Sequence, residues 1–383
     1  MHLYTLLDMA KLERHIRDGL VTVNHHKELP MHIFTYTRKV VLENLWDDVT
    51  TKCRGLIVGP NQLIVARPFE KFFNVNTSYR PETQLANIPK TLPIVTEKLD
   101  GSLGILWQID FARISGGTVA RGIATKGSFH SDHATWATLH YLSTYPFAEW
   151  PLGFTPIFEI INEQVQHHIV HYGGSGKLVL TALIDNATGE EADYNALYFW
   201  AKRNGMEVVS IFGKTVDDVV AEDRPNHEGY VLSYPVPGAP PLKLKIKHEN
   251  FLAMQRIVHS ATPRAILDAL EADRFNQITE WVKGVSGPVT DWIQGWVERF
   301  TKAAADVASR AYLLYLQAGR SSPTRKDFAK LVIETAPELS SICFALLDNK
   351  DHYKQVWRVV RAQFADELAK PFTTAPEVDE ELE

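Results

Sequence analysis

The chain has 383 residues, enough for two domains that each bury a core. Its 45% hydrophobic and 22% charged residues are typical of a globular protein, and no apolar run approaches the length of a membrane span. The net charge of −6 argues against a basic nucleic-acid coat protein, so a nucleic-acid site would have to be a local basic groove. The N-terminus lacks a secretory signal pattern, and two cysteines fit a reducing compartment. We therefore expect a cytoplasmic protein that does not enter a membrane.

Up to about residue 250, short β-rich runs alternate with turns marked by Gly, Pro, Asn and Asp. The runs predicted to be strands are residues 55–58, 63–66, 93–96, 105–107, 178–184 and 230–232. A helix is predicted over residues 132–145. Because the connections are too short and irregular for repeated βαβ units, we expect an α+β fold with mainly antiparallel sheets and flanking helices.

After about residue 252, apolar residues recur at three- and four-residue steps. The pattern over residues 289–314 predicts one long amphipathic helix, closed by Gly319. Ser322 at the N-cap and Pro323 in the first turn predict the start of another helix. The period returns over residues 353–364, so this part of the chain is expected to be all-α.

This change of pattern divides the chain into three parts. We expect a first domain over residues 1–251 and a helical C-terminal domain over residues 252–369. The last stretch, residues 370–383, contains one lysine and five acids and is predicted to be a disordered acidic tail.

Lys98 lies between a predicted strand and an Asp100-Gly101 turn. A lysine amine can attack a nucleotide α-phosphate and hold the nucleotide as a phosphoramidate, provided that the amine is deprotonated near neutral pH. Burial or neighbouring cations can lower the pKa of an amine far enough. A lysine in this setting is more often an exposed surface residue, so the interpretation depends on other segments.

Further segments contain the residue types that nucleotidyl transfer requires. They are residues 52–55, 67–74, 125–128, 158–161, 228–231 and 243–247. In the last of these, strand alternation sends Lys243, Lys245 and Lys247 to one face. Three ammonium groups on one face repel one another unless an anion lies between them, and a triphosphate would supply that anion. The alternative is an edge strand whose lysines guard against aggregation.

Taken together, these segments resemble the motifs of the covalent nucleotidyltransferases, the superfamily of polynucleotide ligases and mRNA capping enzymes. Residues 98–101 match the lysine motif, and residues 158–159, 228–229 and 245–247 follow in family order. Other stretches, between residues 53 and 128, are similar to those of the ATP-dependent RNA ligase 1 family of T-even bacteriophages. The likeness covers about residues 50–250 and implies a nucleotidyltransferase domain.

The resemblance implies a role for each matching residue. The residues implied to bind ATP are Arg54, Lys71, Phe73, Lys98, Asp100, Gly101, Lys126, Glu159, Lys245 and Lys247. Among them Arg54, Lys71 and Lys126 would hold the ATP phosphates or, later, the 5′-phosphate of RNA.

The implied catalytic residues form a smaller set, which is Lys98, Glu159, Glu228, Lys245 and Lys247. Lys98 would form lysyl-AMP, and Lys245 and Lys247 would contact the α-phosphate and lower the pKa of the Lys98 amine. Glu159 and Glu228 would be the metal ligands for Mg²⁺. Glu159 would act through a metal-bound water, or it would contact the AMP ribose instead.

The resemblance departs from the family pattern at one place. Relatives carry an Asn-Arg pair where this chain has Gln166 and His167, followed by His168. The contact made by that arginine is therefore not expected here. No zinc-ligand spacing accompanies the nearby histidines, so the role of His167, His168 and His171 is left open.

The implied activity is an ATP-dependent RNA ligase that joins 5′-phosphate and 3′-hydroxyl ends of single-stranded or nicked RNA through lysyl-AMP and RNA-adenylate. Nicked tRNA is the suggested substrate, with a separate end-healing kinase-phosphatase as a possible partner and a monomer as the expected state. The helices after residue 252, in place of a β-barrel, favour an RNA ligase over a capping enzyme. Two alternatives stay open: a catalytically silent RNA-binding protein and a capping-type guanylyltransferase, which would prefer GTP.

Overall fold

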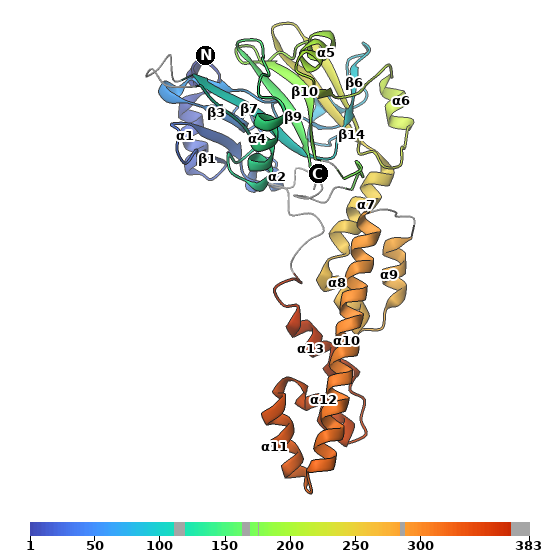
Figure 1. The fold of residues 1–383 in the computed structure, drawn as a ribbon. Helices are drawn as coiled ribbons and strands as arrows, with labels where there is room; N and C mark the ends of the chain where they lie inside the picture. Colours follow the sequence, from blue (N-terminus) through green and yellow to red (C-terminus); the bar gives the residue numbers. More distant parts are fainter. Residues whose placement is uncertain (111–118, 163–168, 175, 284–287, 369–383) are drawn as a thin grey trace. The chain divides into compact units, whose positions relative to one another are not determined.

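The structure, a computed structural model, describes residues 1–110, 119–162, 169–174, 176–283 and 288–368. They form two compact units, one from Met1 to Leu252 and one from Ala253 onward (Figure 1). The predicted α+β class with a helical second half is confirmed. The predicted tail over 370–383 lies outside the described residues. None of the helices in the described ranges combines the length and the apolar character needed to cross a bilayer.

Three sheets make up the first unit. Their strand orders are β1-β2-β3-β4, β11-β10-β9-β7-β8 and β12-β6-β13-β14-β5. All neighbouring pairs are antiparallel except β10 with β11 and β14 with β5. The strands are β1 (Val21–His25), β2 (His32–Tyr36), β3 (Arg54–Val58), β4 (Ile64–Ala66), β5 (Phe73–Asn74), β6 (Ile94–Lys98), β7 (Ser102–Asp110), β8 (Val119–Ala124), β9 (Phe154–Ile161), β10 (Lys177–Asp185), β11 (Glu207–Val208), β12 (Ile211–Phe212), β13 (Gly229–Val236) and β14 (Ala239–Lys247).

Helices flank these sheets and make up the second unit. Those of the first unit are α1 (Met9–Arg17), α2 (Arg38–Leu42), α4 (Asp132–Thr144), α5 (Tyr194–Arg203) and α6 (Val216–Ala221). The chain then continues through α7 (Glu249–Ser260), α8 (Pro263–Glu271), α9 (Phe275–Val282), α10 (Pro288–Ser321), α11 (Arg325–Thr335), α12 (Ser340–Leu347) and α13 (Tyr353–Gln363).

Two predicted helix boundaries are wrong. Gly319 does not close the long helix, because α10 continues to Ser321. A glycine costs only about 1 kcal/mol inside a helix, and the packing of buried neighbours such as Ala318 outweighs that cost. The next helix is capped by Thr324, not by Ser322: the Thr324 hydroxyl accepts the N–H of Asp327 and donates to its carboxylate at 2.6 Å.

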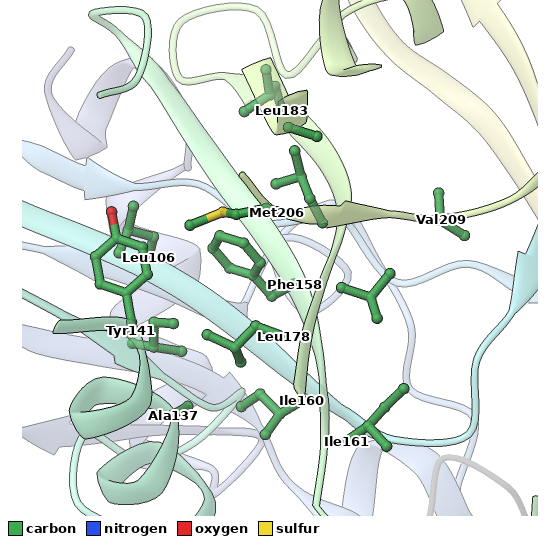
Figure 2. Close-up of a cluster of buried hydrophobic side chains, with 14 of the residues drawn as sticks. Leu106, Ala137, Tyr141, Phe158, Ile160, Ile161, Leu178, Leu183, Met206 and Val209 are labelled. Atoms are coloured by element: carbon green, nitrogen blue, oxygen red, sulfur yellow. The ribbon is translucent and has the colours of Figure 1, made fainter. Parts of the chain in front are cut away.

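A hydrophobic core on one face of the β11-β10-β9-β7-β8 sheet fixes the direction of the β9 side chains. Figure 2 shows Ala137 and Tyr141 of α4 facing Phe158 and Ile160 of β9 across this core. Since side chains alternate along a strand, Glu159 lies on the opposite face of β9.

A second core sets the direction of the side chains on the β12-β6-β13-β14-β5 sheet. Val95 of β6, Leu232 of β13 and Leu244 of β14 are all fully buried in it. The same alternation sends Lys98 and Lys245, together with the other odd-numbered lysines of β14, to the opposite face. These two cores thus lie on the opposite faces of their strands from Lys98, Glu159 and the odd-numbered lysines of β14.

Candidate active site

Lys98 lies at the end of β6, in a row that crosses three strands. It pairs with Gly229 in β13, which pairs in turn with Lys247 in β14. Glu228 directly precedes β13, and its Oε1 lies 2.6 Å from the Nζ of Lys98 and 3.2 Å from the Nζ of Lys247. Glu228 is 1% exposed, so two ammonium groups meet a carboxylate that water barely reaches.

Gly229 allows β13 and β14 to come this close. Its φ is 154°, and a Cβ there would lie 2.0 Å from the carbonyl oxygen of Ile246 and 2.8 Å from the Cα of Lys247. Atoms cannot approach to 2.0 Å without moving the backbone, so any other residue would push β13 away from β14. Gly229 therefore lets β13 and β14 approach each other at the point where the Glu228 carboxylate meets Lys98 and Lys247.

Glu159 reaches the site from the neighbouring sheet. In the turn after Lys98, a Cβ on Gly101 would lie 2.7 Å from the carbonyl oxygen of Ile160 and 2.8 Å from the Cγ of Glu159. The chain then enters β7, where Leu103 pairs with Glu159. The glycine lets the turn cross from β6 to β7 against β9, which brings Glu159 close to the lysine.

The Glu159 carboxyl binds a proton more strongly than the carboxyl of an ordinary glutamate does. Burial raises the pKa of Glu159 to about 8. The positive charges of Lys98 and Arg54 oppose the rise, and the negative charge of Glu228 adds to it. The carboxyl therefore keeps its proton to a higher pH than an ordinary glutamate, and a cation beside it favours the charged form.

The lysines of β14 do not form one continuous cationic row. Lys247 faces Glu228, and Lys245 is 4% exposed beside Asn74 of β5. Lys243 has a different carboxylate: its Nζ lies 2.5 Å from Oε1 of Glu191 and 4.1 Å from the ring centre of Phe69. The expected alternation is present, but protein carboxylates balance the charge at both ends of the row.

Each of the three predicted phosphate-binding cations lies over an aromatic ring. The guanidinium of Arg54 is 5.6 Å from the ring centre of Phe72, and the Nζ of Lys126 is 4.9 Å from that of Tyr36. The Nζ of Lys71 is 5.1 Å from the ring of Trp46 and 5.2 Å from that of Phe73. Lys71 and Lys126 are almost completely buried. Ring faces stabilise cations that have left bulk water, which helps these groups to stay charged where they are buried.

Burial also acts on Arg54. It lowers the pKa of the guanidinium to about 10, and the negative charge of Glu159 opposes that change. Arg54 therefore stays charged at neutral pH. Its interaction with Glu159 places it on the same side of the site as Lys98.

Phe73 and its neighbour Phe72 point to opposite faces of the sheet. The pairing of Phe73 with Leu244 puts the Phe73 ring on the side of the hydrophobic core, where the guanidinium of Arg80 lies 4.3 Å from its centre. Phe72 lies instead between Arg54 and Lys243. A nucleotide contact by Phe73 stays a prediction. Two adjacent phenylalanines are distinguished only by strand register, so the pattern of residues alone does not separate Phe72 from Phe73.

Asp100 makes contacts to the protein's own backbone. Its Oδ2 accepts hydrogen bonds from the N–H groups of Ile169 and Val170. The predicted nucleotide contact of Asp100 is not tested by this geometry and stays a prediction. Of the three histidines noted in the sequence, His167 and His168 lie outside the described residues, and His171 is exposed.

Glu159 and Glu228, the two predicted metal ligands, both interact with Lys98. Within the described ranges, no three acidic, histidine or cysteine side chains gather into a complete metal-binding set. Mg²⁺ commonly binds one or two carboxylates and takes its other ligands from substrate phosphates and water. Two carboxylates beside a lysine fit a magnesium ion of this kind, which would arrive with a nucleotide.

Among solved structures, the chain is similar to ligases at low identity. An archaeal ATP-dependent RNA ligase is 12% identical, with 78% of this chain and 80% of that chain covered and a TM-score of 0.47. A putative ATP-dependent DNA ligase from Aquifex aeolicus is 10% identical, with 90% and 100% covered and a TM-score of 0.46. The RNA ligase of Naegleria gruberi is 19% identical, with 43% and 51% covered and a TM-score of 0.33.

A comparison with curated proteins finds no significant match. A family model described as RNA ligase matches residues 52–249, which is more than half of the chain. The matched range contains every site residue discussed above. The chain therefore belongs to the RNA ligase family, which confirms the family and the class of enzyme predicted from its sequence.

Proposed function

We propose that this RNA ligase uses ATP to join RNA ends through an adenylate held on Lys98. The observation that supports the proposal most is the meeting of Lys98, Glu228 and Lys247 at the end of three paired strands, with Glu159 beside them. A reactive amine, cations and two carboxylates are the groups that phosphoryl transfer from a nucleotide requires.

In the first step, the Nζ of Lys98 attacks the α-phosphorus of ATP, and the bond to the bridging oxygen of the β-phosphate breaks. Pyrophosphate leaves, and the amine loses its proton. The charge that develops on the α-phosphate oxygens is stabilised by Lys245 and Lys247. Mg²⁺, when bound, screens phosphate charge, and Glu159 and Glu228 are the residues that would hold it.

Glu228 has a second part in this step. Its carboxylate forms an ion pair with the Lys98 amine at 2.6 Å and shares the same oxygen with Lys247. The ion pair holds the amine in place but favours its charged form. A cation that engages Glu228 would weaken that pairing at the moment when the amine must lose its proton.

In the later steps, the 5′-phosphate of RNA takes the adenylate from Lys98, which regenerates the amine. A 3′-hydroxyl then attacks the activated 5′-phosphate and expels AMP. We assign the 5′-phosphate to Arg54, Lys71 and Lys126, the cations held over aromatic rings. The helical residues from 253 onward would select the RNA, and nicked tRNA would be the substrate. The enzyme would act as a monomer, with a separate end-healing kinase-phosphatase as its partner.

The first test is labelling with ATP that carries a radioactive α-phosphate. We expect acid-labile label on the wild-type chain and none on Lys98→Ala. Lys177→Ala, which removes a half-exposed lysine paired with Glu207 at 2.8 Å, is the matched control and should be labelled normally. Label that persists on Lys98→Ala would refute the assignment, and label from GTP in place of ATP would favour a capping-type enzyme.

The second test is circularisation of a 5′-phosphorylated single-stranded RNA with ATP and Mg²⁺. We expect a circular product, and we expect none when the 5′-phosphate has been removed. A chain that takes up adenylate but joins no RNA ends would retain the first step of the proposal and refute the later ones.

A further inference from the structure

A short segment, residues 169–172, joins the loop after Lys98 to the loop before Glu228; we call it the 169–172 bridge. Asp100 anchors one side. Its Oδ2 accepts hydrogen bonds from the N–H groups of the first two bridge residues, at 2.7 and 3.0 Å. The backbone N–H of Asp100 donates to the hydroxyl of Tyr172, the last bridge residue, at 2.7 Å.

Asn226 anchors the other side of the bridge. Its Oδ1 accepts the backbone N–H of His171 at 2.7 Å, and its Nδ2 donates to the backbone carbonyl of His171 at 3.1 Å. The side-chain amide thus pairs with both polar groups of one peptide residue, as a neighbouring strand would. Asn226 itself has a left-handed backbone, with φ at 58°. Asparagine is one of the few residues that tolerate this conformation.

The two anchors are placed symmetrically about the reactive groups. Asp100 follows Lys98 by two residues, and Asn226 precedes Glu228 by two residues. Lys98 and Gly229 form the terminal pair of the β6–β13 ladder, so no further pair of that ladder joins the loop after Lys98 to the loop before Glu228. On the β14 side, the Glu228 carbonyl accepts the N–H of His248 at 2.9 Å. Strand ends fray where pairing stops. The 169–172 bridge supplies hydrogen bonds just past the last ladder pair.

We propose that Asn226 is a positioning residue for adenylate transfer, acting through the 169–172 bridge. By tying the loop before Glu228 to the loop after Lys98, it holds Nζ of Lys98 at 2.6 Å from Oε1 of Glu228. The inference rests on the proposed function, because it assigns Asn226 to the same Lys98 chemistry. Asn226 acts without touching the nucleotide.

The size of the expected effect follows from the precision that such chemistry needs. A displacement of about 1 Å of a reacting group can cost about 100-fold in rate. Loss of Asn226 leaves the Asp100 side of the bridge intact, so the displacement should be partial. We expect the rate constant for adenylate transfer to fall by about 10- to 100-fold.

The test uses Asn226→Gly, which keeps the left-handed backbone but removes both hydrogen bonds to His171. Single-turnover labelling of the full chain with α-labelled ATP gives a rate constant, an amplitude and an ATP concentration dependence. We expect a slower rate constant, an unchanged amplitude and an unchanged half-saturating ATP concentration. A merely structural role would instead lower the amplitude, because a fraction of the molecules would be unfolded.

Two variants control the experiment. Asn349→Gly makes the same substitution at an exposed residue with φ at 52° in the helical unit, and it should label like the wild type. Asn226→Asp keeps the acceptor for the His171 N–H and loses the donor, so it should recover part of the lost rate.

The outcomes separate this inference from the proposed function. If the wild type takes up no adenylate, the proposed function fails. If the wild type is labelled and Asn226→Gly reacts at the same rate constant, the positioning role of Asn226 is wrong and the ligase chemistry stands. An Asn226→Gly chain with lower amplitude and unchanged rate constant also overturns the inference.

Discussion

Replacing Glu228 with glutamine removes one negative charge from between two ammonium groups while keeping the shape of the side chain. Glu228 is 1% exposed, and the side chains of its partners Lys98 and Lys247 are 18% and 6% exposed. Breaking a buried ion pair from one side typically costs about 3–5 kcal/mol, because the remaining charges lose their partner in a poorly hydrated place. For a unit of this size, that loss corresponds to a fall in Tm of about 6–20 °C.

Thermal unfolding of Glu228→Gln, followed by circular dichroism, measures this loss. The control is Glu149→Gln, which breaks the exposed ion pair with Arg203, where the two side chains are 67% and 51% exposed. Exposed pairs contribute about 1 kcal/mol or less, so the control should unfold within a few degrees of the wild type. A Glu228→Gln chain as stable as the control would refute the reasoning, because the carboxylate would then not be balancing two buried charges.

Three further predictions concern the electrostatics and the packing of the site. Burial raises the pKa of Glu159 to about 8, from 4.5 for an ordinary glutamate. The free energy of unfolding of the wild type therefore falls as the pH rises from 4.5 to 8, because the folded chain still holds a proton that the unfolded chain has already lost. In urea, Glu159→Gln should be more stable than the wild type above pH 8 and not below pH 4.5. In urea, Gly229→Ala should lower the free energy of unfolding clearly more than Gly238→Ala does. A Cβ on Gly238 meets open space at φ 71°, so that control should lose only about 1–2 kcal/mol, and equal losses would contradict the close approach of β13 and β14. Lys243→Met should destabilise the first unit by about 3–5 kcal/mol, because it leaves the Glu191 carboxylate without its ammonium partner. The double variant that also carries Glu191→Leu should recover most of that loss. Additive losses would show that the two side chains do not interact.

Much of the site could be predicted from local patterns. Period-2 alternation correctly sent the odd-numbered lysines of β14 to one face, because the apolar residues between them had to be buried. The Asp100-Gly101 pair marked the turn after Lys98, and the family resemblance picked out the Glu228-Gly229 pair. The glycines themselves are needed because distant backbone segments approach them closely, which the sequence alone does not reveal.

What could not be predicted depends on contacts between distant residues. Glu191 neutralises Lys243 from 52 positions away, and nothing near either residue indicates that pair. The same holds for Asn226, whose partner His171 lies 55 residues earlier. The helix cap was predicted at Ser322 and lies at Thr324. Both are capping residues, and only the reciprocal contact of Thr324 with Asp327 distinguishes them.

The most direct measurement is the mass of the intact chain after incubation with ATP and Mg²⁺, followed by mapping of the modified peptide. A gain of one adenylate, located on Lys98 and absent when Glu228 has been replaced by glutamine, is the expected result. An unmodified chain, or an adenylate found on a different lysine, would contradict the account.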